Sequence, residues 1–167
     1  MPTIPVWPPK RFSPLAPDDF GALYEAHSRA ITQSAYDAIV TSDSTGNVAG
    51  WNKSAERMFG YTEAQAMGQP LTLLIPQRYR EAHLAGMERL RTGAAMRHTG
   101  AYIELNGLRR DGSEFPLEVT LARWESSAGW FVTAIMSDIT ERKSAENQLR
   151  KLSQAVEQSP ESILITD

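Results

Sequence analysis

A pair of β-prone segments joined by a tight turn, residues 102–124, constrains the fold of this chain more than any other feature. The Asp111-Gly112 pair is a strong turn signal, because glycine takes positive φ without a steric penalty. Apolar residues alternate with other residues over 114–121, which is typical of a strand with one buried face. Ile103 and Leu105 repeat the alternation more weakly before the turn. An isolated hairpin is marginally stable in water, so the sequence predicts a larger sheet with a second layer over its apolar face.

Further strands and helices are predicted on both sides of this hairpin. The β-prone runs 38–41 and 48–51 are separated by turn-forming residues at 42–47, which favours a second hairpin. Residues 130–136 are nearly all apolar, as is typical of a central strand that is covered on both faces. Helical patterns with capping and stop signals fall between these strands, at residues 53–59, 62–68 and 77–92.

The order of these elements defines the expected fold class. Two strands are followed by short helices, then by a longer helix, and then by three strands. This order predicts an α+β fold with a five-stranded antiparallel sheet and helices inserted between the second and third strands. The helices are expected to cover one face of the sheet and to enclose an apolar space, which either side chains or a ligand can fill.

The two ends of the chain differ from this core. Repeated prolines in residues 1–17 indicate a flexible or extended lead-in, and residues 18–34 have the spacing of an N-terminal cap helix. Residues 141–158 are predicted as a helical linker, either laid on its own domain or paired in a parallel coil. Its apolar residues form a short heptad seam: Ala145, Leu149, Leu152 and Val156. We favour the coil, and we therefore expect a homodimer formed through the N-terminal and linker helices.

Composition excludes several classes of function. The chain has 17 lysines and arginines against 20 aspartates and glutamates, a net charge of −3, which argues against nucleic acid as the main partner. It has no cysteine, which excludes disulfides, thiolate-bound metal centres and thiol chemistry. No apolar run is long enough to cross a membrane and no secretion signal is visible, so a cytoplasmic segment without membrane contact is expected. No phosphate-binding loop or nucleophile–base arrangement is present, so we do not expect this segment to be an enzyme.

Several motifs occur in the order found in one family of sensory domains. They are GWNKSAERMFGY at 50–61, GQPL at 68–71, LIP at 74–76, RDGSEFP at 110–116 and DITER at 138–142. Together they resemble the PAS family, over roughly residues 30–142, with the domain placed at 35–140. The resemblance implies a signalling module rather than a catalyst. In such a module the state of the ligand or cofactor in the cavity shifts the sheet, and the sheet biases the activity of an attached effector.

The resemblance also extends to the exit from the domain. Asp138, Ile139 and Thr140 resemble the point where the last strand of these domains passes into a connecting helix, and we assign them to signal relay. Residues 159–167 resemble the start of a second PAS domain, because they echo the wording of 34–43. The chain is therefore expected to belong to a longer receptor, with an effector such as a diguanylate cyclase or phosphodiesterase, or a histidine kinase.

His83 is the main candidate for a cofactor contact. It falls on the apolar face of helix 77–92 and follows the run PQRYR, where haem-binding members of the family carry their iron ligand. Arg89 would reach a haem propionate, and Met87, Tyr102 and Ile103 would complete the pocket. The alternative is a packed core histidine without a metal. The distal arginine of the oxygen-sensing haem relatives is absent, since residues 101–104 read AYIE, and Met96 or His98 would be the distal ligand.

Three occupants of the cavity remain open: haem b, FAD and none. The light-sensing flavin chemistry of the family needs a reactive cysteine and is therefore excluded. A redox FAD would lie near Trp51 and Asn52, although packing and helix capping are the alternative roles of these two residues. A domain without a cofactor would instead act as a dimerisation or interaction module.

Overall fold

The computed structural model describes residues 19–96 and 100–157 and contains one five-stranded antiparallel sheet. Its strand order is β2-β1-β5-β4-β3, which confirms the predicted fold class. The strands are β1 (Ala38–Asp43), β2 (Val48–Trp51), β3 (Ile103–Leu108), β4 (Glu114–Ser126) and β5 (Gly129–Asp138). The helices are α1 (Asp19–Ser34), α2 (Lys53–Phe59), α3 (Glu63–Ala66), the 3₁₀ helix η1 (Leu71–Leu74), α4 (Gln77–Arg91) and α5 (Thr140–Glu157). The predicted lead-in 1–17 and second domain start 159–167 lie outside the described residues.

The β3–β4 hairpin forms where the alternation and the turn signal predict it. Gly112 has a φ of 86°, and the Asp111 carboxylate accepts hydrogen bonds from the backbone and hydroxyl of Ser113 at 2.8 and 2.6 Å. In β4 the predicted inward residues Phe115, Leu117 and Val119 are buried. Burial of this face requires a covering layer, because apolar surface is stabilised by removal from water.

β5 is central in the sheet, but the prediction that both of its faces are covered is wrong. Val132 and Met136 are buried on the inner face, whereas Ile135 on the outer face is 44% exposed. The outer face carries its own contacts, including Trp124 stacked on Phe131 with ring centroids 4.7 Å apart. The apolar run therefore reflects side-chain packing across neighbouring strands rather than a second covering layer.

The turn between β1 and β2 is shorter than residues 42–47 predict. Ser42 and Asp43 belong to β1, where Ser42 pairs with Val132 of β5. The Asp43 carboxylate then closes the turn by accepting hydrogen bonds from the backbone of Thr45 and Asn47 at 2.8 and 3.0 Å. Side chains of serine and aspartate favour turns in isolation, but pairing with a central strand overrides that preference here.

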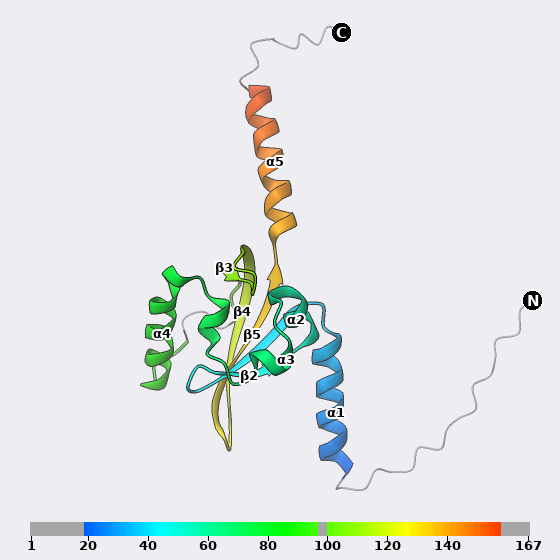
Figure 1. Ribbon diagram of the computed structural model, residues 1–167, viewed down its shortest axis with the longest axis vertical. Coiled ribbons are helices and arrows are strands. Elements are labelled where there is room, and N and C mark those ends of the chain that lie inside the picture. Colours follow the sequence, from blue (N-terminus) through cyan, green and yellow to red (C-terminus); the bar gives the residue numbers. More distant parts are fainter. Residues whose placement is uncertain (1–18, 97–99, 158–167) are drawn as a thin grey trace, which may run out of the picture.

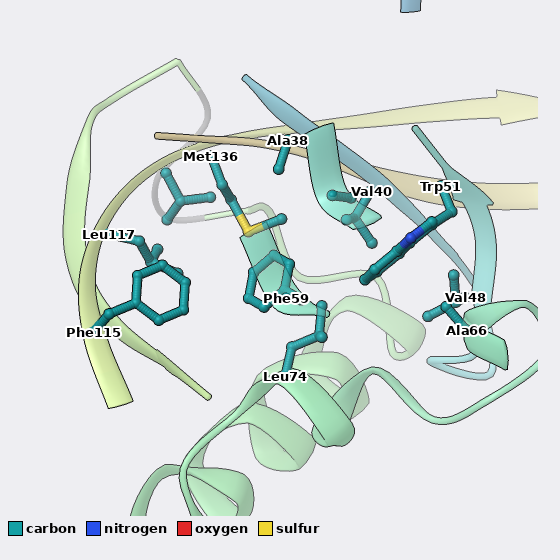
Figure 2. Close-up of a cluster of buried hydrophobic side chains, with 12 residues drawn as sticks. Ala38, Val40, Val48, Trp51, Phe59, Ala66, Leu74, Phe115, Leu117 and Met136 are labelled. Atoms are coloured by element: carbon teal, nitrogen blue, oxygen red, sulfur yellow. The ribbon is translucent and has the colours of Figure 1, made fainter. Parts of the chain in front are cut away.

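The hydrophobic core lies between the inner sheet face and the short helices (Figure 2). Phe59 at the end of α2 connects two aromatic neighbours, with ring centroids 5.9 Å from Trp51 and 5.6 Å from Phe115. Gly60 follows Phe59 with a φ of 80° and ends the helix, as its sequence position predicts. Phe59 thus joins the β2 side of the core to the β3–β4 side.

The two terminal helices carry exposed apolar side chains. On α1, Leu23, Tyr24 and Ile31 are all exposed, so the cap helix buries little of its apolar face within the described chain. α5 extends away from the sheet (Figure 1), and its seam residues Leu149 and Leu152 are exposed. No helix in the described ranges is long and apolar enough to cross a membrane.

Candidate ligand cavity and signal exit

A cavity of about 350 Å³ lies between the inner face of the sheet and helix α4. Most of its lining is apolar, contributed by β1, β3, β4, β5, η1 and α4. No side chain of α4 is fully buried, so this helix forms a loosely packed wall. An apolar, partly enclosed space with a few polar groups is the usual form of a small-molecule site.

Three of the predicted contact residues line this cavity. His83, Met87 and Arg89 all come from α4, with His83 and Met87 half-buried and Arg89 exposed. Burial lowers the pKa of His83 below its ordinary value, so its imidazole is neutral at pH 7. His83 forms no hydrogen bond within the described part of the chain, which leaves both ring nitrogens available to an occupant.

Four other predicted contact residues lie outside the cavity lining: Trp51, Asn52, Tyr102 and Ile103. Trp51 is buried and donates from Nε1 to the carbonyl of Tyr61 at 3.2 Å. Tyr102 is 76% exposed, and Ile103 packs against the core cluster. Met96 does line the cavity, whereas His98 lies outside the described residues.

Asn52 is also outside the cavity, and all its hydrogen-bonding capacity is used by the backbone. Its Oδ1 accepts from Ile39 and Ala55, both at 2.9 Å, and its Nδ2 donates to the carbonyls of Thr32 and Asp37 at 2.9 and 3.0 Å. The first pair caps α2 and fixes β1, and the second pair joins the last turn of α1 to the residue before β1. The geometry matches the capping role that the sequence offered as the alternative.

Ser42 is a cavity residue that the sequence analysis missed. It lies on the inward face of β1 and is 1% exposed, and its Oγ has no hydrogen-bond partner among the described residues. The signal was present in the sequence, because Ala38, Val40 and Ser42 alternate with period two. The inward position of Ser42 was missed because Ser42 was assigned to the turn between β1 and β2.

The predicted relay residues form a compact exit from β5 into α5. The Asp138 carboxylate accepts from the backbone and hydroxyl of Thr140 at 2.9 and 2.6 Å, which caps the helix. Ile139 is buried, and its amide donates to the carbonyl of Pro116 at 3.1 Å. Burial acts to raise the pKa of Asp138, but the hydrogen bonds from Thr140 and Arg109 outweigh it and hold the pKa below the ordinary value.

Arg109 is the second residue that the sequence analysis missed. Its guanidinium lies over the ring of Phe115, 3.7 Å from the centroid, and donates to Asp138 Oδ2 at 2.6 Å. It also donates to the carbonyl of Met58 at the end of α2. Phe115 contacts Phe59, which lines the cavity, so side-chain contacts are continuous from the cavity to the exit.

The first turn of α5 is also held by charges on the sheet. Arg142 pairs with Glu104 and Glu118 at 3.1 and 3.3 Å, and Lys143 pairs with Glu104 at 2.5 Å. These pairs join α5 to β3 and β4, two strands that also contribute to the cavity wall. Exposed ion pairs contribute little stability each, so their main effect is on the orientation of the helix.

Comparisons with known proteins agree with this geometry. A family model described as PAS domain matches residues 37–141. The chain is 30% identical over 128 residues to the sensor protein FixL of Bradyrhizobium diazoefficiens, covering 77% of this chain and 25% of FixL. It is 25% identical over 138 residues to the oxygen sensor protein DosP of Escherichia coli, covering 83% of this chain and 17% of DosP.

A solved PAS domain from Colwellia psychrerythraea has the same fold, with a TM-score of 0.59 at 24% identity. The superposition covers 71% of this chain and 98% of that structure. The chain spans about a quarter or less of the length of the curated relatives reported above. Because the family match extends over the whole sheet and the helices that cover it, the chain belongs to the PAS family of sensory domains.

Proposed function

We propose that this PAS domain binds a small molecule or cofactor in its cavity and transmits the occupancy through α5 to an effector elsewhere in a longer protein. The observation that carries the proposal is the continuous contact from the cavity wall to the helix cap. Phe59 touches the cavity at one end, and Asp138 caps α5 at the other. A ligand can bias an effector only if the two states differ in contacts along such a route.

The relay works through two mechanical links. Phe115 packs between Phe59 and the Arg109 guanidinium, so a shift of the cavity wall changes the position of that guanidinium. Arg109 holds Asp138, and Asp138 caps the first turn of α5. Weakening either hydrogen bond frees the start of the helix and changes its direction relative to the sheet.

Haem is the cofactor for which the lining offers specific residues. His83 supplies a neutral imidazole without a partner in the described chain, which is the form that binds iron. Arg89 would pair with a propionate, and the apolar walls would surround the porphyrin. Bound haem would supply an iron that takes up a small gas or changes its oxidation state. The relationship to an oxygen sensor of Escherichia coli supports testing this first.

A cofactor-free interaction module is the second candidate function. The observation that favours it is the set of exposed apolar residues on α1 and α5, which a second copy of the chain would cover: Leu23, Tyr24, Ile31, Leu149 and Leu152. In this form the chain would act as a homodimerisation domain.

The effector would be a kinase or a cyclic dinucleotide enzyme. The relationship to cell-division histidine kinases of Brucella supports a kinase.

The visible absorption spectrum of the purified chain separates these functions. A Soret band that is lost in His83→Ala supports haem, and a flavin spectrum supports FAD. A transparent visible region excludes both cofactors and leaves an organic ligand or no ligand. His27→Ala is the matched control, because His27 lies on α1, outside the cavity lining, and its loss is expected to leave the spectrum unchanged.

A further inference from the structure

Within residues 19–96 and 100–157, a buried hydroxyl of the cavity has no hydrogen-bond partner, whereas the neighbouring hydroxyl on the same strand has one. On the outer face of β1, Thr41 and Thr133 join their hydroxyls at 2.9 Å. One residue on, the Ser42 hydroxyl faces inward and has no partner among the described residues. Buried polar groups are nearly always hydrogen-bonded, because an unpaired one forfeits its bond to water. The occupant of the cavity is therefore the natural source of the missing bond.

A water molecule is a poor substitute at this position. An ordered buried water needs about two to four polar partners. The inward neighbours of Ser42 along and across the sheet are Val40, Val48 and Val132, and all three have apolar side chains. A water beside Ser42 would therefore exchange one unsatisfied group for another.

The charges of the lining limit what the occupant's polar group is. No aspartate or glutamate lines the cavity in the described chain, and Arg89 is exposed rather than enclosed. Ser42, the enclosed polar side chain of the sheet wall, is a hydroxyl without charge, and the amide of Asn106 in the lining is exposed. An ionised group placed beside Ser42 would lose its hydration without a counter-charge, which is costly. An uncharged hydroxyl or carbonyl meets no such cost.

We propose that Ser42 is a ligand-binding residue, and that the cavity takes an apolar organic molecule whose uncharged hydroxyl or carbonyl bonds to Ser42 Oγ. This inference rests on the proposed sensory function and specifies its ligand. His83 alone is compatible with haem and with an organic ligand, and Ser42 favours the second. The polar groups of a haem are ionised carboxylates, which would lie at the exposed Arg89 and leave the Ser42 hydroxyl among apolar walls without a partner.

The test uses naphthalene and 2-naphthol, two flat apolar probes that differ by one hydroxyl. Calorimetry on the full chain gives the ratio of their affinities for the wild type and for Ser42→Ala. We expect Ser42→Ala to lower the preference for 2-naphthol by about five- to tenfold, the usual size of one net hydrogen bond. Thr41→Val removes the neighbouring hydroxyl from the outer face and is expected to leave this ratio unchanged.

The outcomes separate the assignment of Ser42 from the proposed function. If both probes bind and Ser42→Ala leaves the ratio unchanged, the Ser42 assignment is overturned while the ligand-binding cavity stands. A chain that purifies with a Soret band also overturns the assignment, and it retains the sensory function with haem as the occupant. If neither probe binds and the chain has no chromophore, the ligand-binding function fails together with the assignment. A loss of affinity for 2-naphthol alone in Ser42→Ala supports it.

Discussion

Gly107 lies opposite Phe115 in the β3–β4 pair, and its lack of a side chain leaves room for the side chains of Phe115 and Leu117. A Cβ at this position would lie 2.6 Å from Leu117 Cδ2 and 2.8 Å from Phe115 Cε1. We predict that Gly107→Ala lowers the free energy of unfolding by about 1–3 kcal/mol, the usual cost of overpacking. Urea unfolding measures the change.

Gly21→Ala is the matched control for this prediction. A Cβ at Gly21 meets no atom within 4 Å, and the residue lies inside α1. Alanine favours a helix over glycine, so this variant is expected to be as stable as the wild type or slightly more stable. If Gly107→Ala were equally stable, the close packing of Gly107 against β4 would be contradicted.

Residues that shape the local backbone, as helix caps or in turns, were predictable from the sequence. Residues that act through tertiary contacts were not. Asn52 as a helix cap and Gly112 as a turn residue follow from local rules, and the structure confirms both. Arg109 was not predictable, because its contacts with Met58 and Asp138 join segments distant in sequence. Local patterns indicate which face of a strand is buried. They do not indicate which distant residues a charged side chain near that strand contacts.

At the scale of elements, the hold of β5 on α5 depends on the charge of Asp138. Hydrogen bonds lower the pKa of this carboxyl in the folded chain, so its contribution is complete above the ordinary value of about 4. The contribution is lost as the pH falls through the lower folded pKa. The backbone amide of Lys143 donates to the carbonyl of Ile139 in the first turn of α5. We predict that the protection of this amide against hydrogen exchange decreases below about pH 4.

The variant Asp138→Asn tests whether this carboxyl is responsible. Asparagine at 138 removes the ion pair with Arg109, so protection of the Lys143 amide is expected to be lower than in the wild type at neutral pH and to change little on acidification. Asp111→Asn is the control, because the pKa of Asp111 is also lowered but the residue lies in the β3–β4 turn. Equal acid sensitivity in the wild type and Asp138→Asn would refute the assignment.

The seam of α5 carries the prediction of a homodimer. Leu149 and Leu152 are exposed, and a parallel partner helix would cover both. We predict that the double change Leu149→Glu and Leu152→Glu weakens self-association at least about tenfold in analytical ultracentrifugation, because it buries charge in the seam. The double change Asn147→Glu and Gln154→Glu adds the same charge away from the seam and should have little effect. A wild type that stays monomeric at high micromolar concentration would contradict the prediction.

At the scale of the whole molecule, the order of elements was predictable because each strand and helix has a clear period and clear stop signals. The position of the cavity was predictable in outline, since helices on one face of a sheet leave a space above it. The residues that line the cavity were only partly predictable. His83 and Met87 follow from helical spacing, whereas Tyr102 comes just before the first residue of β3 and is exposed. Sequence spacing does not specify where a strand begins to within one residue, and one residue reverses the face.

An occupant of the cavity that acts on an effector must change the structure at the start of α5. Amide chemical shifts measure this change most directly. Spectra of the full chain are compared without and with saturating naphthalene, for the wild type and for Arg109→Ala. We predict that naphthalene shifts the amides of residues 138–143 in the wild type, and that Arg109→Ala retains the cavity shifts while losing those at 138–143. Wild-type shifts confined to the cavity lining would contradict the account.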